Sequence, residues 1–158
     1  MLEPILEYPV SGNQERYLLA ERFTGASYPI PYSYRISGRL DPQGLQSAID
    51  LLVARYDILR THFHSRKDGF IGEVRPSGAV QLLHRRMPDE SDSAIHAAIS
   101  AEFDAKLTEL SSAQMFRVLL VSRSETEHLL TVSLHHAIGD GISMDILVRE
   151  LFAAYVGD

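Results

Sequence analysis

Two apolar runs near the end of the sequence constrain the fold most. Residues 115–122 and 128–135 are rich in aliphatic and β-branched side chains, and the polar segment 123–127 separates them. Runs of this composition, bounded by polar residues, are typical of strands. A short polar connection between two strands makes them antiparallel neighbours. The sequence therefore predicts a β-hairpin here, the clearest in the chain.

The second run leads into a tight loop, His135-His136-Ala137-Ile138-Gly139-Asp140-Gly141, before a helical pattern from about Ser143. Neighbouring residues on a strand point to opposite faces, so we expect only one of the two histidines to face a given cleft. Histidine has an unperturbed pKa close to neutral, which suits proton transfer. The loop is therefore the first candidate for chemistry.

The remaining patterns predict an α+β chain, with a mostly antiparallel or mixed sheet and about four helices packed on it. Ser11 is a plausible N-cap of a helix that ends before Gly25, and Asp41 with Pro42 is a typical helix start. The other expected elements are a loop at 26–31, strands at 32–37, 61–64, 70–74 and 80–83, turns at 67–69 and 76–78, and helices after 89–92 and 143.

Composition limits the class of protein. The chain has 158 residues, a net charge of -6 and no cysteine. The length suits one domain, and the negative charge argues against a nucleic-acid partner. We find no apolar stretch long enough to cross a membrane and no signal-peptide pattern, and we expect no membrane partner. The lack of cysteine excludes disulfides and is compatible with a cytoplasmic location.

Several interpretations of the loop stay open on the residues alone. A metal site of His135, His136 and Asp140 is disfavoured because both rings must converge on one ion, and we expect no metal. Both histidines can instead be satisfied by hydrogen bonds at the end of a strand. Asp140 can orient a histidine ring, pair with an arginine or serve only as a turn residue.

Other charged residues have weaker signals. Arg60 is either exposed at the end of a helix, or it is buried with its guanidinium paired to a carboxylate from another segment. The basic pairs 66–67 and 85–86 can make local anion contacts, although solvated loop charges are the simpler interpretation. Five histidines have no distinctive context and are interpreted as surface or packing residues: His62, His64, His84, His96 and His128.

Three motifs, in the same order, resemble those of the condensation domains of nonribosomal peptide synthetases, in the chloramphenicol acetyltransferase-like superfamily. Residues 135–141 fit the HHxxxDG signature. Residues 11–16 are similar to SxAQxR, with Asn13 in place of alanine. Residues 55–63 are similar to RHExLRTxF, with Tyr56 for histidine and Asp57 for glutamate.

The resemblance implies a role for each matched residue. His136 corresponds to the catalytic histidine, and His135 to its structural support. Asp140 corresponds to an aspartate that forms a salt bridge with the arginine of the motif at residues 55–63, here Arg60. This salt bridge is expected to shape the loop. Gly141 is expected to leave room for a substrate arm.

The resemblance also implies a reaction and its partners. An acceptor amine attacks a donor acyl or peptidyl thioester, and 4′-phosphopantetheine arms on donor and acceptor peptidyl carrier proteins deliver both. No tightly bound cofactor is expected. His136 acts either as general base or by positioning the amine and stabilising the charged intermediate.

The family fold has two lobes, and the resemblance places residues 1–158 in the N-terminal lobe. The C-terminal lobe is absent, so we expect negligible activity from the chain alone. The alternatives are an O-acyltransferase, an epimerization domain, or a non-catalytic module that recruits a carrier protein or enzyme. A heterocyclization domain is disfavoured because its signature replaces the two histidines.

Overall fold

A computed structural model describes residues 6–75, 80–103 and 114–157. The helices are α1 Gly12–Thr24, α2 Pro42–Arg55, α3 Asp92–Phe103 and α4 Gly141–Val156, with a short 3-10 helix at Asp57–Arg60. The strands are β1 Leu6–Pro9, β2 Pro29–Ser37, β3 Thr61–Arg66, β4 Gly69–Val74, β5 Leu82–Arg86, β6 Phe116–Ser122 and β7 Glu127–His135. The predicted α+β class is confirmed.

The predicted hairpin of β6 and β7 forms the centre of a four-stranded sheet in the order β2-β7-β6-β5. β7 pairs with β2 and β6 in antiparallel register, whereas β5 pairs with β6 in parallel. A parallel pair requires a crossover, and α3 lies in that connection. The other strands form a separate sheet, β1-β4-β3, a division that the sequence pattern did not indicate.

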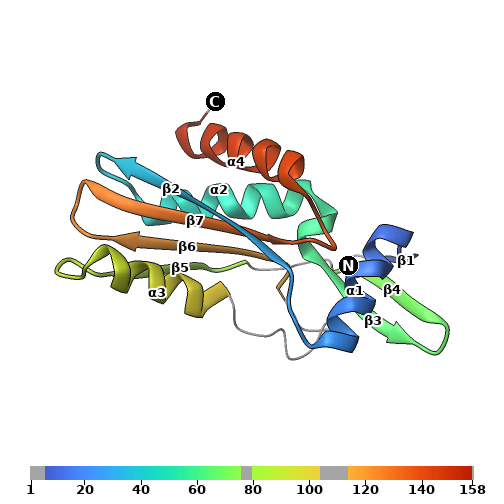
Figure 1. The fold of residues 1–158 in the computed structure, drawn as a ribbon. Coiled ribbons are helices and arrows are strands. Elements are labelled where there is room, and N and C mark those ends of the chain that lie inside the picture. Colours follow the sequence, from blue (N-terminus) through green and yellow to red (C-terminus); the bar gives the residue numbers. More distant parts are fainter. Residues whose placement is uncertain (1–5, 76–79, 104–113, 158) are drawn as a thin grey trace.

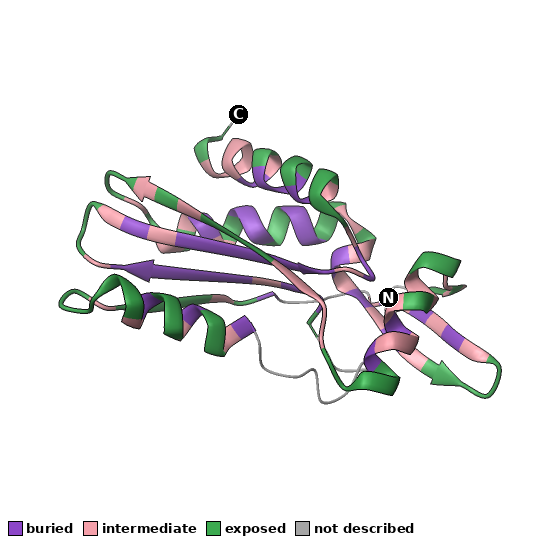
Figure 2. Cartoon of the chain, in the orientation of Figure 1, coloured by how far each residue is buried: buried purple, intermediate pink, exposed green. Residues whose placement is uncertain are grey.

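The four-stranded sheet has helices on both faces. Helices α2 and α4 lie side by side on one face, and α3 covers the other face (Figure 1). Most residues of β6 and β7 are buried as a result (Figure 2). A strand covered on both faces has a nearly continuous apolar sequence, which explains the two runs that predicted the hairpin.

Two expected strands have a boundary that shifts by three residues. β2 begins at Pro29, inside the segment that we interpreted as a loop. The strand lies at the edge of its sheet, where proline is tolerated because its missing N–H leaves no ladder bond unmade. The strand expected at 80–83 is observed at Leu82–Arg86, and the turn expected at 76–78 lies outside the described residues.

Helix α2 begins as the sequence predicts. The Asp41 carboxylate accepts hydrogen bonds from the N–H groups of Gln43 and Gly44, at 3.0 and 3.1 Å. Pro42 occupies the first turn, where a missing N–H costs nothing. The buried stripe of the helix packs against the sheet and consists of Leu45, Ala48, Ile49, Leu52 and Val53.

Replacing Asp41 tests this cap. Asp41→Ala leaves two N–H groups of the first turn without their acceptor, and we expect the free energy of unfolding to fall by about 1 kcal/mol in urea titrations. Asp89→Ala, an exposed aspartate outside any helix, is the control and should change it by less than about 0.5 kcal/mol. Equal effects from both variants would contradict the cap.

Candidate functional site

The motif loop begins where β7 ends, and backbone hydrogen bonds to both neighbouring segments fix that point. The His135 N–H donates to the Met115 carbonyl at 2.8 Å, and the His136 N–H donates to the Tyr28 carbonyl at 3.0 Å. The Ile138 N–H then donates to the His135 carbonyl at 2.9 Å and closes a turn. The position of the His136 backbone is therefore set by the sheet.

His135 is buried and links the loop to α1. Its Nε2 atom lies 2.9 Å from Oε2 of Glu21, which is also buried. Its Nδ1 atom accepts a hydrogen bond from the Ala137 N–H at 3.0 Å. Because Nδ1 accepts, the neutral ring carries its proton on Nε2, beside the carboxylate. The ring therefore contacts the loop on one side and α1 on the other.

His136 is partly exposed and has a different environment. Its imidazole stacks on the Tyr17 phenol ring, with centroids 4.8 Å apart and planes inclined by 8°. No side-chain hydrogen bond engages the ring among residues 6–75, 80–103 and 114–157. The two histidines thus differ in burial, one being buried and the other partly exposed, although both contact the same helix.

Helix α1 supplies both contacts. Tyr17 and Glu21 lie one turn apart on one face of the helix. The helix starts at a capping box, in which the Ser11 hydroxyl accepts from the Gln14 N–H and the Gln14 side chain accepts from the Ser11 N–H. From the sequence we interpreted Tyr17 only as part of the apolar side of this helix, and we did not single out Glu21. Their four-residue spacing in a helix opened by a matched motif is the signal that was available.

The predicted pair of Arg60 and Asp140 is wrong for this structure. Arg60 donates to the carboxylate of Asp57, three residues earlier, and to the Arg75 carbonyl. Asp140 is exposed and caps α4, accepting from the Ser143 N–H at 2.9 Å and the Ser143 hydroxyl at 2.8 Å. An aspartate just before a helix finds partners in the first turn at little entropic cost, so no distant arginine is required.

The motif at residues 55–63 forms the turn that redirects the chain from α2 into β3. The Thr61 hydroxyl donates to the Asp57 carbonyl at 2.9 Å, and Leu59 and Phe63 are buried. The Tyr56 hydroxyl, at the motif position where the family has histidine, donates to the Glu150 carboxylate at 2.6 Å. That hydrogen bond raises the pKa of Tyr56, with a smaller contribution from burial. The motif therefore ties α2 to α4.

The two glycines of the loop have unequal room. A Cβ on Gly139 would lie 2.9 Å from Cδ1 of Leu134 and 3.1 Å from Cβ of Ser143. A Cβ on Gly141 would meet nothing closer than the Tyr32 hydroxyl at 3.8 Å. Gly139 is required by packing, whereas Gly141 has room for a methyl group.

Neither a metal centre nor a membrane span is found in the described residues. Within 6–75, 80–103 and 114–157, no group of three or more histidine, aspartate or glutamate side chains is arranged to hold a metal ion. None of the helices described there has the length and apolar composition needed to cross a membrane.

Comparison with known proteins identifies the family. A family model described as "Condensation domain" matches residues 5–157. The chain belongs to the condensation-domain family. It is 34% identical to tyrocidine synthase 3 of Brevibacillus parabrevis over 99% of its own length and 2% of that protein. It is 31% identical to surfactin synthase subunit 1 of Bacillus subtilis over 96% of its length and 4% of that protein.

Two solved structures have the same fold. The starter condensation domain of rhizomide synthetase RzmA superposes with a TM-score of 0.85 at 20% identity, over 95% of this chain and 37% of that one. The X-domain from teicoplanin biosynthesis gives a TM-score of 0.83 at 28% identity, over 93% of this chain and 32% of that one. The chain therefore spans about a third of these domains and a few per cent of the synthetases.

Alanine at the two loop glycines tests the packing of this condensation-domain loop. Gly139→Ala forces Leu134 or Ser143 to move, and we expect a loss of about 1–3 kcal/mol in the free energy of unfolding, measured in urea. Gly141→Ala is the matched control, because its Cβ has room and its φ is not positive. It should be neutral or stabilising by up to about 1 kcal/mol. The reverse order of the two effects would contradict this packing of the loop.

The cap on α4 predicts a pH dependence. Hydrogen bonds from the Ser143 backbone and hydroxyl lower the pKa of Asp140 below the ordinary 3.8. The stabilisation by ionised Asp140 is thus complete above that ordinary pKa and is lost as pH falls through the lower folded-state pKa. Thermal unfolding should show Asp140→Ala less stable than wild type at pH 7, with a smaller difference near pH 2.

Asp140→Asn is the control for that measurement. Its amide oxygen can still cap the helix but does not titrate. The melting temperature of this variant should therefore lose the part of the acid dependence that belongs to residue 140. A constant difference between wild type and Asp140→Ala at all pH values would rule out the ionised cap.

Proposed function

We propose that the chain is the N-terminal lobe of a two-lobed condensation domain, in which His136 serves amide-bond formation on carrier-bound substrates. One observation carries the proposal. Of the two adjacent motif histidines, His135 is buried against Glu21, while His136 is partly exposed, stacked on Tyr17 and free of side-chain hydrogen bonds in the described residues. Such a ring is oriented yet open to a substrate.

The proposed reaction is acyl transfer from sulfur to nitrogen. The amine of an acceptor aminoacyl thioester attacks the carbonyl carbon of the donor thioester. A C–N bond forms, the C–S bond breaks, and the donor phosphopantetheine thiol leaves. One proton is lost from the attacking nitrogen and one is gained by the leaving sulfur. Both phosphopantetheine arms belong to the substrates and arrive on peptidyl carrier proteins.

His136 has two possible tasks in this reaction. As a general base, its neutral imidazole accepts the proton of the attacking amine within about 2.6–3.2 Å. As a positioning group, it holds the amine and stabilises the charged intermediate, which tolerates looser geometry. The stack on Tyr17 supports either task because it restricts the ring without occupying its nitrogens. The exposure of Gly141, where a Cβ would contact only the Tyr32 hydroxyl, supports the approach of a pantetheine arm.

The isolated lobe is expected to be inactive. The family places the reaction between two lobes, and this chain supplies His136 from one of them. Without the second lobe, the arms lack half of their positioning contacts, and effective concentration is a large part of such catalysis.

A recruitment module is the second candidate function. The observation that favours it is the 28% identity to the X-domain of teicoplanin biosynthesis, a domain whose structure is also known in complex with OxyB. The intact signature at residues 135–141 argues for catalysis instead, because recruitment modules of the family typically alter it.

The test uses the complete two-lobed domain that contains this chain, with loaded donor and acceptor carrier proteins. His136→Ala should lower kcat by about 10²–10⁴-fold. His96→Ala, an exposed histidine on α3, is the control and should retain wild-type rates. An inactive wild-type domain that still binds a partner enzyme would favour recruitment, and wild-type turnover by His136→Ala would remove His136 from catalysis.

Two further measurements in the same assay separate the remaining alternatives. A general base acts only as the neutral imidazole, so the rate should be lost in acid, whereas a positioning role does not require this dependence. An alcohol acceptor used in preference to an amine would instead identify an O-acyltransferase.

A further inference from the structure

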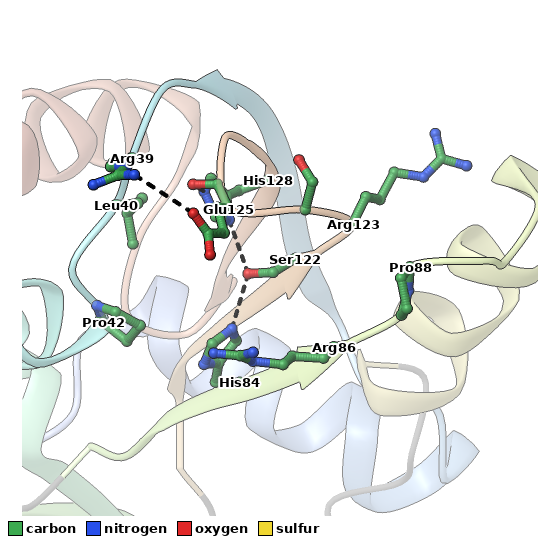
Figure 3. Close-up of a pocket in the computed structure, with 11 residues that line it drawn as sticks. Arg39, Leu40, Pro42, His84, Arg86, Pro88, Ser122, Arg123, Glu125 and His128 are labelled. Carbon is green, nitrogen blue, oxygen red and sulfur yellow. Dashed lines mark hydrogen bonds and ion pairs between the residues drawn. The ribbon is translucent and has the colours of Figure 1, made fainter.

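Figure 3 shows a cavity of about 560 Å³ that is lined by His128, near the start of β7, whereas His136 follows the end of that strand. The cavity lies beside the β6–β7 turn and the loop that enters α2. β7 separates the two places by roughly 23 Å, at about 3.3 Å per residue from His128 to His135. The volume falls in the range of pockets for small organic ligands.

Two histidines that we interpreted as surface or packing residues are joined in the wall of this cavity. The Ser122 hydroxyl lies 2.8 Å from Nε2 of His84 and 2.8 Å from Nδ1 of His128. Nε2 of His128 lies 3.3 Å from the Glu125 carbonyl. A carbonyl only accepts, so His128 donates from Nε2 and accepts from Ser122 at Nδ1.

The direction of these hydrogen bonds determines which ring nitrogen of His84 can still gain a proton. Ser122 donates to His128, so it accepts from Nε2–H of His84. Nδ1 of His84 is then the atom that can gain a proton without breaking any of these hydrogen bonds. The neighbouring Arg86 and His128 oppose that proton, and burial opposes it most, so the pKa of His84 is lowered.

The arginines of the cavity differ in how far they are neutralised. Arg123 pairs with Asp92 at 2.8 Å and donates to the Glu90 carbonyl. Arg39 contacts Glu125 at 3.7 Å, with both side chains more than four-fifths exposed, so that pair is weak. The side chain of Arg86 has no ion pair or hydrogen bond among the residues that the structure describes. Its guanidinium is the unneutralised charge of the cavity.

We propose that this cavity binds a small phosphate monoester. Arg86 and protonated His84 contact the phosphate, and the apolar side chains of Leu40, Pro42 and Pro88 contact the organic part. A guanidinium matches the geometry of phosphate oxygens and forms strong charge-assisted hydrogen bonds. Since the net charge of the chain is -6, the attraction is local to the cavity. The proposal is independent of catalysis at His136.

Binding is coupled to a proton. A neutral His84 presents a lone pair at Nδ1, whereas the protonated ring presents a donor. The groups that face it are Arg86 on its own strand, His128 on β7, and Arg39, Arg123 and Glu125 from the adjoining loops. A bound dianion favours the protonated ring, so affinity for a ligand of constant charge increases as pH falls.

The test is an NMR titration of the ¹⁵N-labelled 158-residue chain with phenyl phosphate and with inorganic phosphate. Phenyl phosphate should shift signals of β5 and residues 122–128 saturably, with a lower Kd than inorganic phosphate. Arg86→Gln should raise the Kd about tenfold or more. Arg85→Gln is the matched control, because Arg85 points to the other face of β5 and pairs with Glu102.

The pH arm uses sulfate, which stays a dianion between pH 8 and pH 5.5. Wild type should bind it more tightly at pH 5.5, His84→Gln should lose that dependence, and the control His96→Gln should keep it. Equal weakening by Arg85→Gln and Arg86→Gln would reduce the effect to diffuse charge and overturn the proposal. Shifts that do not saturate, or equal affinity for the two phosphates, would also overturn it.

Discussion

The hydrogen-bond ladder of β7 is the constraint on which the site depends. This strand pairs on both edges, with β2 and with β6, and its last N–H groups donate to Met115 and Tyr28 on the neighbouring segments. Both faces of the hairpin are covered by helices, which bury most of its residues (Figure 2). A fully paired and covered strand leaves its end little freedom. The loop that carries His136 therefore starts from a fixed point.

Helix α1 gives the two histidines at the start of this loop different environments. The Glu21 carboxylate lies beside the buried ring of His135. Burial of a polar ring is costly unless a polar partner is close. Tyr17, one turn earlier, offers a flat apolar surface to His136 and leaves its nitrogens open. The same helix thus anchors one ring and orients the other. The matched opening motif contributes indirectly, since Ser11 and Gln14 set where the helix begins.

Sequence patterns predicted interactions well where the partners are close in the chain. The caps at Ser11 and Asp41, the apolar stripe of α2 and the β6–β7 hairpin depend on neighbours within a few residues or on one short turn, and each is present. Predictions of distant partners were weaker. Asp140 bonds to Ser143 and Arg60 to Asp57, so each charge is satisfied locally and the expected ion pair is not formed. His84 and His128 meet only because β5 and β7 flank β6.

By itself, the sequence determined the α+β class, the central hairpin and the order of three motifs that resemble those of condensation domains, because periodicity, caps and motif spacing are local properties of the chain. Only the tertiary structure decided which of the two motif histidines is buried, which helix holds it, and that the Arg86 side chain has no ion pair among the described residues. Those outcomes depend on strand order and on packing between segments far apart in sequence. Two side chains with identical chemistry in adjacent positions can differ in function only through such surroundings.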